Sequence, residues 1–217
     1  MSLVHPNKLT AFYAILANAI PLYGVLFWDW SIYLIFVLFW FENVVIGFFT
    51  LSQIIAFGLK RIIVDRDNPF SFLGILFTGA FFTVHYGIFT MGHGAMIFAL
   101  FGDGIVDSGE FPEAHQLVEI FMGNNLLWAA LLIILASAFA AIRQFSEHRK
   151  ALNATIIMFS PYGRIIVLHI GLLFGGLAAQ ALGSPVWMLV LLIALKSAYD
   201  LIGFEFKTQA KQQAETT

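Results

Sequence analysis

The chain has 217 residues, of which 60% are hydrophobic and only 11% are charged, with a formal net charge of −2. Soluble domains carry about one quarter charged residues, so these few charges cannot cover a globule and the composition excludes a soluble protein. The small net charge offers no basic surface for nucleic acid. The absence of cysteine excludes disulfides, thiolate metal sites and thiol nucleophiles.

Long apolar segments follow one another along most of the chain. A membrane span needs about 20 largely apolar residues, and lipid offers no partner for exposed backbone groups, so each span is expected to be a helix. Six segments qualify, at residues 9–28, 30–59, 71–101, 117–142, 163–183 and 185–205. We therefore predict an all-α polytopic membrane protein, a single six-helix domain over 1–205 with a polar tail at 206–217.

Basic residues indicate the orientation of these spans. Ten of the 11 Lys and Arg residues lie at the two ends of the chain, or in or directly beside alternate connections: Lys8, Lys60, Arg61, Arg66, Arg143, Arg149, Lys150, Arg164, Lys207 and Lys211. The other three connections carry none. Short basic loops stay in the cytoplasm, so both termini are expected there.

Two ionisable residues fall near the middle of the bilayer by helical rise, Glu42 in the second span and His85 in the third. Such groups are costly in lipid, so they normally face the bundle interior and often mark function. Glu42, followed by Asn43, is either a protonated acid that holds helices together or a functional acid, base, ligand or proton carrier. His85 is either a satisfied core histidine or part of the same functional layer.

His93 follows His85 on the third span but lies about 12 Å nearer the outside and points in a different direction. The two histidines cannot bind one ion from a continuous helix. They would do so only if Gly87, Gly92 and Gly94 unwound it, whereas glycines in a span more often allow close contact or a bend. We therefore expect His93 to face a separate outer polar layer, formed with Asn124 and Asn125 of the fourth span.

Two longer connections separate the middle spans. The outer loop at 102–116 is acidic and is expected to be solvated, with Pro112 in the first turn of the helix that follows. The inner loop at 143–162 is long enough for a short helix against lipid headgroups.

The last two spans carry a second group of polar residues near the inner side. His169 lies near the inner end of the fifth span, and Asp200 lies at similar depth on the sixth. A carboxylate beside an imidazole orients the ring and raises its basicity, so the two predict a pair across helices. Lys196 shares a helix face with Asp200 and is the alternative partner. Arg164, near the inner interface, is expected to extend its charge to the headgroups.

Three segments together resemble an uncharacterised family of small multi-span membrane proteins of bacteria and archaea, catalogued as a domain of unknown function. They read FWFENVVIGFF at 39–49, HYGIFTMGHG at 85–94 and PYGRIIVLHIG at 161–171. The resemblance implies that the family's recurring motifs contain Glu42, His85, His93, Arg164 and His169. It also implies a prokaryotic cytoplasmic membrane, and it supplies no activity.

Three classes of function remain open from the sequence. Titratable groups at three depths suit a proton-coupled transporter or permeation pathway for a small solute or ion. Four residues would alternatively bind a divalent metal such as zinc in an intramembrane hydrolase of a lipid-like substrate: Glu42, His85, His169 and Asp200. In an accessory membrane protein the same groups would only lock helix packing. The lipid bilayer is the expected partner in every case, and the glycine-rich fifth span suits a homo-oligomer as well as the bundle.

Overall fold

The computed structural model describes residues 23–24, 27–28, 30–63, 71–102, 111–147, 154–159, 161–163, 165–167, 169–171, 174 and 194–195. The chain divides into two compact units, one formed by Met1–Ile32 with Ile166–Thr217 and the other by Tyr33–Ile165. Most of the predicted spans at 9–28 and 185–205, and all of the tail at 206–217, lie outside the described residues.

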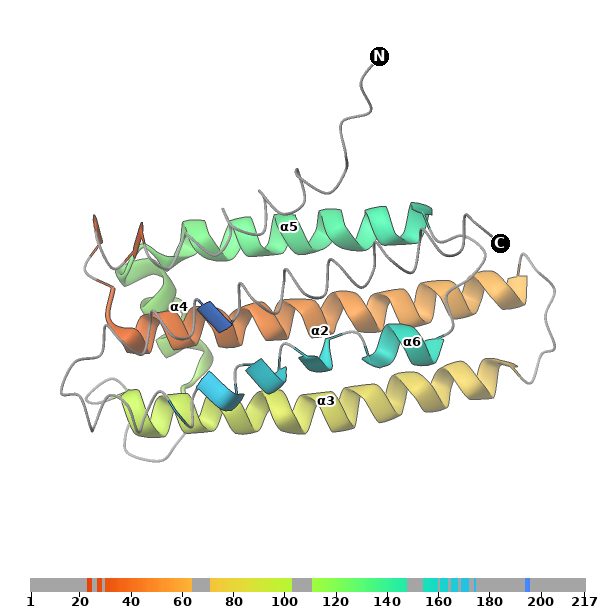
Figure 1. The fold of residues 1–217 in the computed structure, drawn as a ribbon, viewed down its shortest axis with the longest axis horizontal. Helices are drawn as coiled ribbons and strands as arrows, with labels where there is room; N and C mark the ends of the chain where they lie inside the picture. The colour runs from red at the N-terminus through yellow and green to blue at the C-terminus, as the bar shows by residue number, and fades with distance from the viewer. Residues whose placement is uncertain are drawn as a thin grey trace, which may run out of the picture. The chain divides into compact units, whose positions relative to one another are not determined.

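Every described element of secondary structure is an α-helix, and no strand occurs in the part of the chain that the structure describes. The helices are α2 (Ile32–Ile63), α3 (Ser71–Phe101), α4 (Ala114–Gly123), α5 (Leu126–Glu147) and α6 (Ala154–Phe159), labelled in Figure 1. The all-α prediction is confirmed for these residues.

The three long helices lie side by side, with α2 between α3 and α5 (Figure 1). A hydrogen bond joins α2 to α5, in which the Gln53 side-chain nitrogen Nε2 donates to the carbonyl of Ala141 at 3.2 Å. The central position explains why 61% of the most apolar 18-residue stretch of α2 is buried, whereas the corresponding share is 11% in α3 and 17% in α5. The outer helices therefore turn most of their apolar side chains outward.

These three helices are long and apolar enough to cross a membrane, over Ile32–Lys60, Phe72–Phe101 and Leu126–Arg143. They correspond to the predicted spans at 30–59 and 71–101 and to most of the span at 117–142. At 1.5 Å per residue α2 and α3 are each about 45 Å long, which exceeds the hydrocarbon thickness.

The third predicted span is one unbroken helix through its glycines. α3 runs from Ser71 to Phe101 without interruption. Gly94 sits against the Trp40 and Phe111 rings, whereas Gly87 and Gly92 face open space within the described part of the chain. The glycines therefore do not unwind the helix, and His85 and His93 keep the separate directions that a continuous helix imposes.

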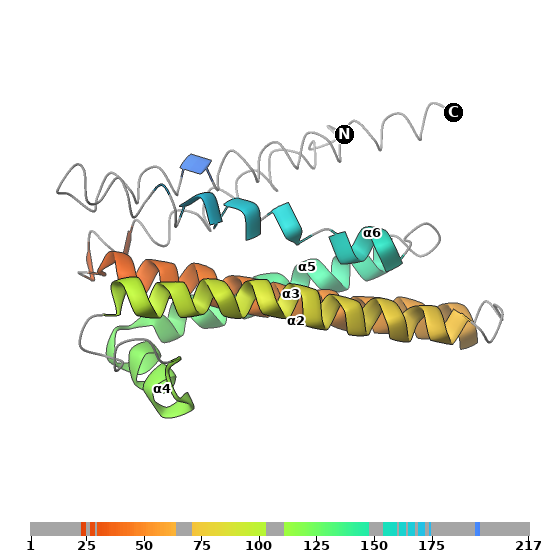
Figure 2. The same cartoon turned by 90° about the horizontal axis from the view of Figure 1, so that it is seen from below.

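The fourth predicted span differs from a single helix over 117–142. Helix α4 ends at Gly123 and α5 begins at Leu126, and between them Asn125 adopts a positive φ of 58°. Asparagine tolerates this left-handed conformation better than most residues, which is the physical reason that the chain turns here. Figure 2 shows α4 turned out of the direction of α5.

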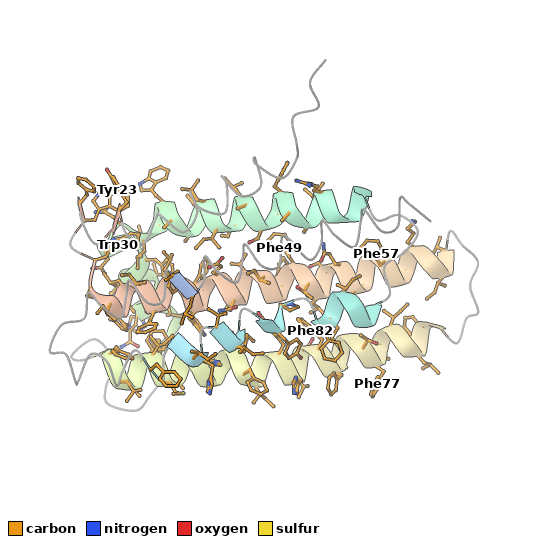
Figure 3. All side chains as sticks on the ribbon, viewed as in Figure 1. Tyr23, Trp30, Phe49, Phe57, Phe77 and Phe82 are labelled. Atoms are coloured by element: carbon orange, nitrogen blue, oxygen red, sulfur yellow. The ribbon has the colours of Figure 1, made fainter. Side chains whose placement is uncertain are left out.

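Helix α6 packs more deeply than a helix lying on the headgroups would. Its residues Ile157 and Met158 join a buried cluster with side chains of α2 and α3. Two members of the cluster, Phe57 and Phe82, are labelled in Figure 3. The whole cluster contains Ile54, Phe57, Phe82, Tyr86, Ile157, Met158 and Ile165. The inner connection at 143–162 therefore ends inside the helical unit, because its apolar side chains gain more from burial between helices than from a headgroup surface.

Candidate functional site

Two hydrogen bonds cross between the first half of α2 and the middle of α3. The Trp40 indole nitrogen Nε1 donates to the carbonyl of Thr90 at 2.9 Å, and the Tyr86 hydroxyl donates to the carbonyl of Asn43 at 3.0 Å. We call these four residues, Trp40, Asn43, Tyr86 and Thr90, the α2–α3 polar seam. All four side chains are buried, so the seam is a row of polar groups inside an otherwise apolar interface.

Close approach of the two helices depends on small residues beside the seam. A Cβ atom on Gly47 would lie 2.5 Å from the Tyr86 ring, and one on Gly94 would lie 2.7 Å from the Trp40 nitrogen Nε1. Small residues let membrane helices approach closely enough for side chains to reach a neighbouring backbone. Both glycines therefore make room for the two aromatic side chains whose hydrogen bonds cross the interface.

A second polar contact joins α3 to the segment that follows α6. His85 Nδ1 lies 2.7 Å from the Tyr162 hydroxyl, and the proton between them belongs to either group according to the tautomer of the ring. The rings of Phe81 and Phe89 lie 5.2 and 5.1 Å from the His85 ring between centroids. We call His85 and Tyr162 the His85–Tyr162 pair.

The pair and the seam are adjacent. The Tyr162 ring lies 5.9 Å from the Tyr86 ring, edge to face, and Tyr86 in turn bonds to Asn43. An imidazole, two phenols and the backbone carbonyl of Asn43 thus follow one another from the exposed side of α3 to its buried interface with α2. His85 is exposed and Tyr86 buried, so this row connects the surroundings of the helix to its interior.

Glu42 and His85 directly precede Asn43 and Tyr86, which are joined by a crossing hydrogen bond. They therefore lie within about one helical turn of each other along neighbouring helices, and their common depth in a membrane stays a prediction. Glu42 itself is half-buried. Its role as acid, base or ligand stays a prediction.

His93 lies on the same helix as the seam but has a local partner. It is buried, and its Nδ1 lies 2.7 Å from the carbonyl of Phe89 one turn earlier. Asn124 donates from its Nδ2 to the carbonyl of Ile120 at 2.9 Å, and Asn125 is exposed in the turn before α5. These contacts assign the asparagines to the end of α4, and a layer shared with His93 stays a prediction.

The other predicted ligands are only partly described. His169 is exposed and belongs to the unit formed by Met1–Ile32 with Ile166–Thr217. Arg164, Lys196 and Asp200 lie outside the described residues. Among the residues that the structure describes, no three His, Asp or Glu side chains gather closely enough to hold a metal ion. The four-residue metal site that includes Asp200 therefore stays a prediction.

The sequence did not predict the uncharged residues that make the hydrogen bonds between helices: Trp40, Tyr86, Thr90 and Tyr162. A search for ionisable residues passes over them, because phenol, indole and hydroxyl groups are common in apolar spans. One signal was present for Tyr162: it directly follows Pro161, and proline interrupts a helix. Pro161 is buried, and Tyr162 and Gly163 are helical again after it.

By length and composition the three long helices suit a lipid bilayer, and this places the chain among α-helical membrane proteins. The chain belongs to a family of unknown function (DUF6498), which it matches over residues 2–217. The match confirms the resemblance to an uncharacterised family that the three motifs suggested. Comparisons with curated proteins and with solved structures find no match.

Proposed function

We propose that the chain is a six-span protein of a prokaryotic cytoplasmic membrane, with both termini in the cytoplasm, that moves protons, alone or coupled to a small solute. The observation that carries the proposal is the His85–Tyr162 pair, whose Nδ1 to hydroxyl distance is 2.7 Å. It joins two segments far apart in the chain, halfway along a helix of membrane-spanning length.

Histidine suits this task because its ring can take up a proton on one nitrogen and release a proton from the other. A phenol bonded to the ring fixes the orientation of the imidazole and offers a hydroxyl for proton exchange. Polar groups within a membrane helix are costly and are retained mainly along substrate and proton pathways. The row from His85 through Tyr162 and Tyr86 to Asn43 has this character.

The interruption of the helical segment beside the pair also supports transport. Helix α6 ends at Phe159, and after Pro161 the amide of Ile165 bonds to the Pro161 carbonyl at 3.5 Å. Transporters commonly place their binding sites at discontinuous helices near the midplane. Tyr162 stands in the first turn after such an interruption. The zinc-type hydrolase has no comparable support within the described residues.

Proton flux into liposomes tests the proposal. Purified protein is reconstituted with a trapped pH-sensitive dye, and a potassium diffusion potential drives proton entry. We expect the wild-type chain to carry protons at a rate that depends on pH, and His85→Gln to abolish most of this flux because glutamine does not titrate. Tyr162→Phe should retain a reduced flux, because it keeps the ring but removes the hydroxyl.

His115→Gln is the matched control. His115 is an exposed histidine of α4 that lies 3.2 Å from Glu113 and has no contact with the pair. Its substitution should leave the flux unchanged. A flux that is insensitive both to pH and to the substitutions His85→Gln and Glu42→Gln would exclude the proposal.

A further inference from the structure

Two oxygen atoms of the α2–α3 polar seam are buried without a hydrogen-bond partner in the described part of the chain. They are Asn43 Oδ1 and Thr90 Oγ1, and the side chains that carry them are only 6% and 7% exposed. Leaving a buried polar atom unsatisfied is unfavourable, and such atoms are rare in native proteins. Their occurrence at one interface suggests that they share a partner.

The hydroxyl of Thr90 differs from the other threonine hydroxyls of α3 that have described bonds. Thr78 and Thr83 each donate to the carbonyl four residues earlier, Gly74 and Gly79, at 2.8 Å. This local bond is the usual way in which a helical threonine satisfies its hydroxyl. Thr90 is more deeply buried and its hydroxyl does not make this bond.

The two unpartnered oxygens belong to residues that lie within about one helical turn of each other along the interface. Trp40 bonds to the carbonyl of Thr90, and Tyr86 bonds to the carbonyl of Asn43. The helices run antiparallel, with Trp40 opposite Thr90 and Asn43 opposite Tyr86, so Asn43 and Thr90 are about one helical turn apart. Side chains lean towards the N-terminus of their own helix, which directs these two towards each other. The Asn43 Nδ2 group already donates to the carbonyl of Phe39 at 3.0 Å, which leaves Oδ1 as the available acceptor.

We propose that Asn43 Oδ1 and Thr90 Oγ1 bind a single water molecule between α2 and α3. A buried water typically makes two to four hydrogen bonds to polar groups that otherwise lack partners. It can donate to Oδ1, which only accepts, and can accept from or donate to the threonine hydroxyl. A calcium or magnesium ion needs about six oxygen ligands, more than these two oxygens offer.

The bound water also extends the row of groups from His85 to Asn43 by one step, to the hydroxyl of Thr90. His85 contacts Tyr162, the Tyr162 ring packs on Tyr86, and Tyr86 bonds to the carbonyl of Asn43. When a water molecule takes up a proton on its oxygen and releases another proton from one of its O–H groups, it is again a water molecule. It can therefore pass a proton from one neighbour to the next. This relay role rests on the proposed function, whereas the water site itself does not.

Thermal unfolding of the purified full-length chain tests the site through the substitution Thr90→Val, which removes the hydroxyl and keeps the shape. If the hydroxyl holds a water, Thr90→Val lowers the melting temperature by about 2–4 °C, because it leaves Asn43 Oδ1 and the water short of a partner. Thr90→Ser, which keeps the hydroxyl, should lose less. Thr83→Val is the matched control, since the Thr83 hydroxyl already has a local partner, and should change the midpoint little.

The sign of the result decides the question. An unchanged or raised melting temperature for Thr90→Val would overturn the proposal, because removing a truly unsatisfied hydroxyl is neutral or favourable. Combining Thr90→Val with Asn43→Leu should give less than the sum of the two separate losses, since both act on one water. Strict additivity would show that the two residues do not share a ligand.

The relay role is separated from the site by the flux assay. Thr90→Val should slow proton flux in liposomes while Thr83→Val does not. If the wild-type chain carries no protons, the proposed function fails and the relay with it, but the melting temperatures still decide whether the water site exists. If wild-type flux is present and Thr90→Val leaves it unchanged, the relay is wrong while the proposed function stands.

Discussion

Gly92 and Gly94 stand two residues apart on α3 and meet opposite surroundings. A Cβ atom on Gly94 would lie 2.7 Å from the Trp40 nitrogen Nε1 and 2.9 Å from the Phe111 ring, whereas one on Gly92 would meet nothing within 4 Å in the described part of the chain. The Trp40 ring cannot move away freely, because its indole nitrogen is bonded to the carbonyl of Thr90. Gly94 is therefore required by packing, and Gly92 is not.

Alanine at these two positions should have opposite effects. We expect Gly94→Ala to destabilise the chain by about 1–3 kcal/mol, the usual cost of overpacking. Gly92→Ala should be neutral or should stabilise by up to about 1 kcal/mol, because alanine is the better helix former. Chemical unfolding of the purified variants in one detergent measures both. Equal effects of the two substitutions would contradict the close packing of Trp40 on Gly94.

At the scale of elements, the break between α4 and α5 separates a short helix from a membrane-spanning one. α4 has 10 residues, too few to span hydrocarbon, and it exposes the apolar side chains of Val118 and Met122. Its last turn is held by the Asn124 side chain on the carbonyl of Ile120, and the left-handed Asn125 redirects the chain into α5. One apolar run in the sequence thus becomes two elements.

The turn predicts a specific response at Asn125. Asn125→Gly should be tolerated, because glycine adopts a positive φ without strain. Asn125→Val should destabilise the chain by about 1–2 kcal/mol, since a β-branched side chain clashes with the backbone in this conformation. Unfolding midpoints of the two variants, compared with the wild type, check the prediction. Equal stability of the valine and glycine variants would mean that the left-handed turn does not form.

At the scale of the whole molecule, the arrangement expected across the membrane follows from where the charges lie. α2 ends near Lys60 and Arg61, and α5 ends beyond Arg143, whereas α4 between α3 and α5 carries Glu113 and Glu119 without Lys or Arg. Basic ends on one side and an acidic connection on the other predict that α4 lies outside the cell. The prediction of one domain over 1–205 and of six spans extends this pattern to residues outside the described ones.

The orientation can be tested without removing any native thiol, because the chain contains no cysteine. In intact cells a membrane-impermeant maleimide should label His115→Cys, which lies on α4, and should not label Lys211→Cys, in the tail. Permeabilised cells should label both, which controls for the reactivity of each thiol. Labelling of Lys211→Cys alone in intact cells would reverse the orientation, and labelling of both would require an odd number of spans.

The sequence by itself determined the fold class, the three long helices and the family. Composition and apolar segment length decide the fold class and the helices, because each helix satisfies its own backbone in lipid whatever its neighbours are. The family was suggested by the resemblance of three segments, at 39–49, 85–94 and 161–171. The sequence also predicts a similar membrane depth for Glu42 and His85, since helical rise depends only on residue number. Only the tertiary structure decided which groups meet: His85 with Tyr162, Tyr86 with Asn43, and Trp40 with Thr90. These contacts depend on the rotation of each helix and on side-chain shape across an interface, which apolar periodicity does not specify when nearly every position is apolar.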